Sequence, residues 1–167
     1  MDYKSKLQPQ NDQPDTIWQP TLEAELEALQ AKFSSEELGR MASYAGIPAA
    51  STLENPASVV LPAILRDFLA WAKGRDFIND KRQWSPVFTP RQIREYMVEY
   101  GLPLAHPSKI PIAMDGGGCF YMVDLKSDSL PMYLVDPGDP QNSCGLLADS
   151  LIAALVDGRS QLDAAGL

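Results

Sequence analysis

The chain has 167 residues, which is long enough for one domain with a substantial hydrophobic core. With 45% hydrophobic and 22% charged residues, its composition is that of an ordinary soluble globular protein. No apolar run approaches the length of a membrane-spanning helix, and the polar N-terminus lacks the apolar core of a signal peptide. We therefore expect a cytoplasmic protein with no membrane partner.

The formal charge of −8 is unevenly distributed along the chain. Residues 61–109 carry five acids and eight bases, a net charge of +3, whereas residues 110–167 carry eight acids and two bases, a net charge of −6. This acidic region disfavours nucleic acid as a direct ligand. It favours a basic protein partner, because opposite charges steer association. The alternative is that the charge serves solubility alone.

The first 57 residues predict a tail and a helical hairpin. Residues 1–20 are rich in Gln, Asn, Asp and Pro, which is typical of a flexible tail, and Trp18 is expected to dock on the body or on a neighbouring molecule. Residues 21–57 contain the hairpin and its connecting loop. Its first helix carries one apolar stripe at helical spacing, formed by Leu22, Leu26, Leu29 and Phe33. Its second helix begins at a Ser34–Glu37 capping box and stops at Gly46.

Residues 58–167 predict an α+β domain, which begins with two amphipathic helices. The first follows Leu61-Pro62 and ends at Gly74, and its buried face comprises Leu61, Leu65, Phe68, Leu69 and Ala72. After a mixed-charge loop and a short extended piece, the second begins at a Thr89–Gln92 capping box. Its inner side comprises Ile93, Tyr96, Met97 and Tyr100. Arg91 and Arg94 lie off that stripe, and we expect them to face solvent or a partner.

The centre of the domain is the segment from Lys109 to Gly158. Two apolar runs, 119–125 and 132–135, have the composition of strands and flank a polar turn, which predicts a β-hairpin. A final helix is expected to start at Asp149 as N-cap and to cover this hairpin. The predicted fold is therefore α+β, a mostly antiparallel sheet with helices packed against it, preceded by the N-terminal helical hairpin.

The sequence contains no recognisable catalytic, cofactor-binding or metal-binding set. Nucleophile-elbow, phosphate-loop, HExxH and CxxC motifs are all missing. Cys119 and Cys144 match no zinc motif and are expected to be buried thiols. His106, the single histidine, has no partner at a recognisable spacing. The glycine run 116–118 leads into a strand, which favours a role in backbone geometry over phosphate binding.

Five aspartates gather around the predicted hairpin, and we take them as the candidate partner-binding residues: Asp115, Asp124, Asp128, Asp136 and Asp139. Their spacing does not fit a calcium-binding EF-hand loop. Aspartate before glycine or proline is also a standard turn residue. We expect these carboxylates to form turns and, where exposed, an acidic rim for a protein. Trp84 is a second candidate, since tryptophan is favoured at binding hot spots, and the alternative is a core tryptophan.

Several segments resemble the SUKH superfamily, the Smi/Knr-like domains. The run LPAILRDFL at 61–69, with Gly74 after it, is similar to the opening helix of that family. Four later segments resemble, in order, its proline-isoleucine segment, glycine turn and strand, next strand, and start of the last helix: Ile110–Ala113, Asp115–Leu125, Met132–Asp136 and Ala148–Leu151. Leu151 replaces the usual aromatic residue of the family.

The resemblance covers about residues 58–157 and implies an α+β fold. It also implies a function, because bacterial members are mostly immunity proteins that bind and neutralise toxins, often nucleases. Eukaryotic relatives are regulatory proteins linked to cell-wall synthesis. The family supplies no catalytic residue, so none is assigned here.

Three hypotheses follow from the sequence. The first is a non-catalytic immunity protein that binds a cognate bacterial toxin. The second is a regulatory or scaffold module that uses the helical hairpin for docking or as a homodimer surface. The third is a small enzyme or ligand-binding protein, which rests on the glycine run, His106 and the aspartates.

Overall fold

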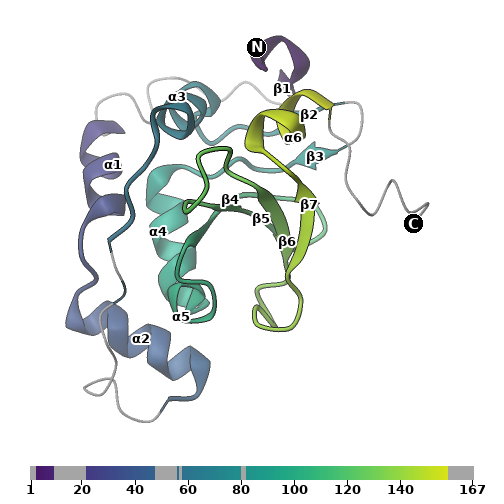
Figure 1. Cartoon of the computed structure of the whole chain (residues 1–167). Helices are drawn as coiled ribbons and strands as arrows, with labels where there is room; N and C mark the ends of the chain where they lie inside the picture. Colours follow the sequence, from purple (N-terminus) through teal and green to yellow (C-terminus); the bar gives the residue numbers. More distant parts are fainter. Residues whose placement is uncertain (1–2, 10–21, 48–55, 57, 80–81, 158–167) are drawn as a thin grey trace.

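Four antiparallel strands form the central sheet, in the order β4 (Lys109–Met114), β5 (Phe120–Asp124), β6 (Met132–Val135) and β7 (Gly145–Ala148) (Figure 1). The computed structural model describes residues 3–9, 22–47, 56, 58–79 and 82–157. The strands β5 and β6 confirm the predicted hairpin, with Phe120 opposite Val135 and Val123 opposite Met132. The sequence did not predict β4 or β7 as strands.

A second, smaller antiparallel sheet consists of β1 (Gln8–Pro9), β2 (Phe77–Ile78) and β3 (Gln83–Trp84). The helices of the described residues are α1 (Leu22–Gln30), α2 (Ser35–Ala45), α3 (Ala63–Ala72), α4 (Pro90–Glu99), α5 (Leu102–Ala105) and α6 (Leu151–Asp157), with one short 3-10 helix at Lys4–Lys6. They pack against the sheets, and the fold is α+β as the sequence predicts. Within the described residues, no helix has the length and apolar character needed to cross a membrane.

Aromatic side chains fill the core on both faces of the central sheet. On one face, Phe120 meets Phe88 and Tyr96 with ring centroids 5.4 and 5.2 Å apart. On the other, Tyr121 lies 4.9 Å from Trp84, which has no exposed surface. Trp84 is therefore a core tryptophan, the alternative that the sequence left open, and it is not accessible to a partner.

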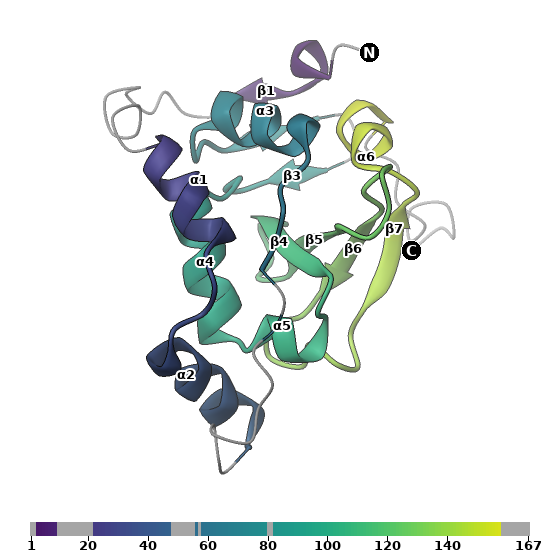
Figure 2. The same cartoon turned by 60° about the vertical axis from the view of Figure 1, so that its left-hand side comes forward.

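The first two helices do not form a hairpin that stands apart from the domain. Figure 2 shows α1 and α2 placed one after the other along α4, and the main packing partner of each is α4. Leu29 of α1, Met41 of α2 and Phe33 between the two helices belong to the same core as the sheet. The sequence assigns residues 21–57 and 58–167 to one compact unit, and the N-terminal hairpin within it is not confirmed.

Arg94 of α4 explains how these helices are held. Its guanidinium lies 2.9 Å from both carboxylate oxygens of Glu37 and donates to the carbonyls of Ala31 and Lys32 at 2.6 and 2.9 Å. It also lies 4.2 Å from the ring centroid of Phe33. Glu37 is at the same time the acid of the predicted capping box, which the structure confirms. The expectation that Arg94 faces solvent or a partner is wrong, because these groups surround it.

The N-terminal residues 3–9 are part of the fold rather than a tail. Tyr3 and Leu7 are buried, and β1 pairs with β2. The Tyr3 hydroxyl donates to the Asp67 carboxylate of α3 at 2.5 Å. Residues 10–21, including Trp18, lie outside the described residues.

The last helix, α6, covers the end of the central sheet. Ser150 is its N-cap in place of the predicted Asp149, because Ser150 Oγ accepts the Ala153 N–H at 3.0 Å. Asn79 donates to the carbonyls of Ala154 and Leu155 at 3.3 and 3.2 Å, which joins α6 to the smaller sheet.

Candidate functional site

The five candidate aspartates lie at the two ends of the central sheet. Successive turns of an antiparallel meander alternate between its ends, so the β4–β5 turn and the loop after β6 share one end. We call this the loop end, and it carries Asp115, Asp136 and Asp139. The opposite end, which we call the turn end, carries Asp124 and Asp128. The structure therefore divides the predicted acidic rim into two groups.

The Asp115 side chain shapes the β4–β5 turn. Its Oδ1 accepts hydrogen bonds from the N–H groups of Gly117 and Cys119 at 2.7 and 3.0 Å. Gly116 and Gly118 adopt φ angles of 87° and 98°, the left-handed region that favours glycine. The glycine run thus closes a tight turn, which confirms its predicted role in backbone geometry.

The turn end carries one structural and one exposed carboxylate. Asp124 is half-buried, and its Oδ1 accepts the Lys126 N–H at 2.9 Å. Asp128 is exposed on the following turn. Asp128 is therefore the exposed carboxylate of this pair, whereas Asp124 is half-buried and stabilises the turn that the sequence predicts.

The loop after β6 is braced by its own hydrogen bonds. Asp136 Oδ1 accepts the Gly138 N–H at 2.8 Å, and Ser143 Oγ donates to the Asp139 carbonyl at 2.6 Å. The Asn142 amide donates to Asp139 Oδ1 at 3.0 Å. Both carboxylates are exposed. The loop therefore holds two charges in fixed positions at the surface.

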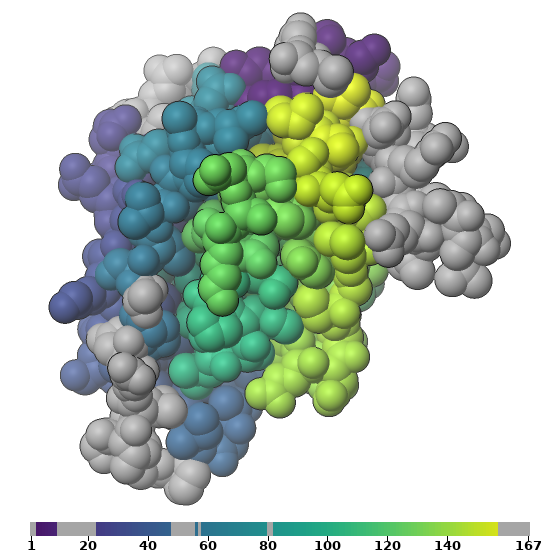
Figure 3. Space-filling model, in the orientation of Figure 1, coloured from purple at the N-terminus to yellow at the C-terminus, as the bar shows by residue number. Residues whose placement is uncertain are grey.

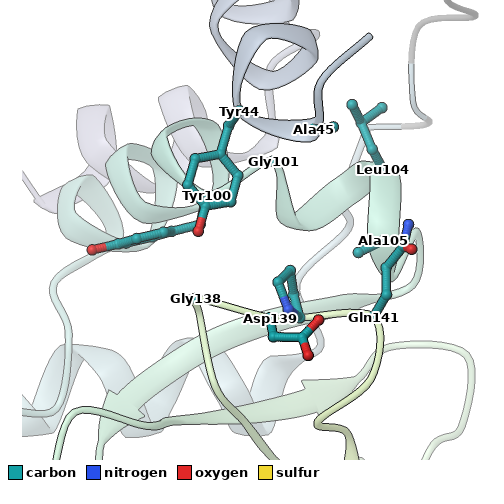
Figure 4. A pocket seen from close by; sticks show the side chains of 10 residues that line it. Tyr44, Ala45, Tyr100, Gly101, Leu104, Ala105, Gly138, Asp139 and Gln141 are labelled. Carbon is teal, nitrogen blue, oxygen red and sulfur yellow. The ribbon is translucent and has the colours of Figure 1, made fainter.

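A cavity of about 400 Å³ lies between this loop and the helices α2, α4 and α5. Figure 3 shows these segments meeting at the lower end of the molecule, and Figure 4 shows the cavity itself. Tyr44 reaches from the last turn of α2 toward the loop, Leu104 and Ala105 of α5 form an apolar wall, and Asp139 lies on the loop side. Its volume is at the lower end of the range of about 300–1,000 Å³ that is typical of ligand sites.

Two hydrogen bonds tie the loop to the helical walls of this cavity. The Tyr44 hydroxyl donates to the Pro137 carbonyl at 2.6 Å. The His106 ring Nε2 lies 2.5 Å from the Pro140 carbonyl oxygen. His106, which has no partner at a recognisable spacing in the sequence, thus holds the loop against the end of α5. The cavity is therefore preformed, because these two hydrogen bonds hold the loop on one side against the helices on the other.

The electrostatics of the cavity favour a cation. Its described lining residues include one carboxylate, Asp139, and no basic side chain. The helices α2 and α4 end at Ala45 and Glu99, beside the cavity, so the negative ends of two helix dipoles lie there. Burial raises the pKa of Tyr100, which lines the cavity, and the charge of Glu99 raises it further.

Two further cavities lack this combination of groups. One of about 450 Å³ between α1 and α4 is bordered by charges of both signs, among which Arg91 pairs with Glu95 at 3.3 Å. Burial raises the pKa of Glu25 at its edge. The other, of about 520 Å³ beside β7, has no charged side chain among its described lining residues. Neither cavity favours one sign of charge.

The cysteines only partly follow the prediction of buried thiols. Cys119 is half-buried and Cys144 is exposed, so the prediction is wrong for Cys144. Burial raises the pKa of the Cys119 thiol, and the charges of Asp115 and Asp136 raise it further. Within the part of the chain that the structure describes, no three His, Cys, Asp or Glu side chains gather to hold a metal ion.

Sequence reasoning found Asp136 and Asp139 but missed the cavity beside them. Tyr44 and Tyr100 carry no motif, and the helical pattern indicates only that Tyr100 lies on the inner side of its helix. The predicted hairpin could have shown that the five aspartates divide between two ends, because its turn lies opposite the segments that enter and leave it. No family model matches the chain, and no curated protein matches it.

Proposed function

We propose that this chain is a non-catalytic protein-binding domain that acts in the cytoplasm and neutralises a cognate bacterial toxin. A basic toxin, such as a nuclease, is the partner that its charge suits best, because nucleases are basic where they hold phosphate. The observation that carries the proposal is the loop after β6. It holds Asp136 and Asp139 exposed and braced beside a preformed cavity.

Charge and resemblance support the same proposal. Residues 110–167 carry a net charge of −6, and three of the five candidate aspartates are exposed. A preformed acidic surface lowers the cost of ordering side chains on binding and raises the association rate with a basic partner. The segments that resemble the SUKH superfamily lie within the described α+β fold, and immunity is the usual role of its bacterial members.

Co-expression with candidate toxins tests the proposal. The candidates are the products of the genes adjacent to the gene for this chain. We expect the chain to restore growth to cells that produce the cognate toxin and to form a stoichiometric complex with it in size-exclusion chromatography. The association rate should fall as salt is added, because salt screens exposed charges. Failure to rescue cells from any adjacent toxin, together with the absence of a complex, would contradict the proposal.

A regulatory or scaffold module is the second candidate function. It is favoured by the position of α2, whose Tyr44 is 43% exposed at the lower end of the molecule. Such a module would bind a housekeeping complex or a second copy of the chain. An affinity purification that returns such a complex, lost when exposed residues of α2 are changed, would favour this function over toxin neutralisation.

A further inference from the structure

The cavity at the loop end combines three kinds of wall. Tyr44 and Tyr100 supply aromatic rings, which meet edge to face at a centroid distance of 5.5 Å. Leu104 and Ala105 supply apolar surface, and Asp139 supplies a carboxylate. These walls are complementary to a ligand that joins an apolar stem to a positively charged head.

The Asp139 carboxylate is positioned for such a head. Its Oδ1 is occupied by the Asn142 amide at 3.0 Å, which fixes the plane of the group. Within the described residues its Oδ2 makes no hydrogen bond, and Asp139 is an exposed residue of the cavity lining. The C-terminal ends of α2 and α4 add negative potential at the same place.

Arginine fits these walls better than lysine does. Its guanidinium is planar and stacks on tyrosine faces, whereas the ammonium of lysine is compact and strongly hydrated. The apolar stems of both side chains can bury against Leu104 and Ala105, so the planar head is what favours arginine. Aromatic and arginine anchors that enter preformed pockets also dominate many protein interfaces.

We infer that the cavity between α2, α5 and the loop after β6 receives an arginine side chain of the partner protein, with its guanidinium paired to Asp139. This inference rests on the proposed function, because it takes the partner to be a basic protein. It assigns the loop end as the centre of the interface and gives the turn end only a role in steering.

Titration of the full chain with N-acetyl-arginine amide, followed in two-dimensional amide NMR spectra, tests the inference without any toxin. We expect saturable shifts at Gly101, Ala105, Gly138 and Gln141, with binding in the millimolar range. The neutral isostere N-acetyl-citrulline amide should bind at least about tenfold more weakly. Equal binding of the two probes, or of N-acetyl-lysine amide and the arginine probe, would overturn the arginine assignment.

Two matched variants distinguish binding at this cavity from nonspecific attraction to the negative charge of the protein. Asp139→Asn should weaken binding of the arginine probe by at least about fivefold, whereas Asp128→Asn, the same change at the turn end, should leave it unchanged. A third variant, Ala105→Leu, keeps every charge and should abolish binding by filling the cavity. Equal effects of the two aspartate changes, or shifts spread over both ends, would overturn the inference.

Failure of the arginine inference can be distinguished from failure of the proposed function. If a toxin is neutralised but the arginine probe does not bind, the function stands and the cavity assignment is wrong. If the probe binds but no adjacent toxin is neutralised, the cavity assignment stands and toxin neutralisation is wrong.

Discussion

The loop end and the turn end of the central sheet carry the same chemical group in different surroundings. At the turn end, Asp128 lies on an exposed turn and lines none of the three cavities described above. At the loop end, Asp139 lies on a braced loop that Tyr44 and His106 tie to two helical segments. The comparison indicates that a surface carboxylate becomes part of a candidate binding site when neighbouring elements add walls and fix its position.

The largest expected effect comes from breaking the attachment of α2, the helix that walls the loop end. Arg94→Ala removes the contacts to Glu37 and to the carbonyls of Ala31 and Lys32. We expect the free energy of unfolding to fall by about 2 kcal/mol, measured by urea denaturation. Amide hydrogen exchange should rise in α2 and stay unchanged in the turn at 125–131.

The neighbouring arginine on the same helix is the control. Arg91→Ala breaks an exposed pair with Glu95, and the cost should stay below about 0.5 kcal/mol. If both changes cost the same, Arg94 does not hold α2, and the structural account of the loop end is wrong.

The second largest effect concerns affinity for a cognate toxin, and it is tested by removing the charges of one end of the sheet at a time. The double change Asp136→Asn and Asp139→Asn should weaken the complex by about tenfold or more, because Asp139 lines the cavity and Asp136 is exposed on the same loop. The double change Asp124→Asn and Asp128→Asn removes the same charge and should mainly slow association at low salt. Surface plasmon resonance separates these two outcomes. A larger loss of affinity from the turn-end variant would show that the turn end, and not the loop end, is the centre of the interface.

A smaller effect comes from one hydroxyl that fixes the loop. Tyr44→Phe removes the hydrogen bond to the Pro137 carbonyl and should cost about 1 kcal/mol of unfolding free energy. Tyr133→Phe is a matched control on the sheet, because the structure gives the Tyr133 ring a contact with Lys109 but no hydroxyl bond within the described residues. Thermal denaturation of both variants checks the difference, and equal shifts in Tm would contradict the role of Tyr44.

The smallest effect is a pH dependence near α2. The hydrogen bond from Arg94 holds the pKa of Glu37 below its ordinary value of 4.5. Because the folded state favours the ionised carboxyl, the pair contributes stability above pH 4.5 that is lost as the pH falls through the lowered pKa. Glu37→Gln should flatten this part of the stability profile, measured by denaturation between neutral and acid pH. An unchanged profile would show that Glu37 is not the titrating group.

Local patterns predicted much of the fold. Ser34 and Thr89 form the two capping boxes that their sequences specify, because such boxes depend on residues three positions apart. The helical spacing of apolar residues in α3 correctly predicted its buried face. The two apolar runs correctly predicted the strands β5 and β6. These features follow from nearby residues, so the sequence alone determines them.

The missed features depend on residues far apart in the chain. β4 contains Pro111, which weakens its strand signal, yet the chain at 85–88 pairs with it and supplies hydrogen bonds to Ile112 and Met114. Arg94 lies off the apolar stripe of α4, and only the packing of α1 and α2 surrounds it. The candidate site needs α2, α5 and the loop after β6 in one place, and no local pattern encodes that meeting.

Hydrogen exchange measured by mass spectrometry on the toxin complex tests the central claim most directly. The account predicts protection of residues 41–45, 100–106 and 136–144 on binding, with little change at 125–131. Protection confined to 125–131, with the loop end exchanging as in the free chain, would contradict it.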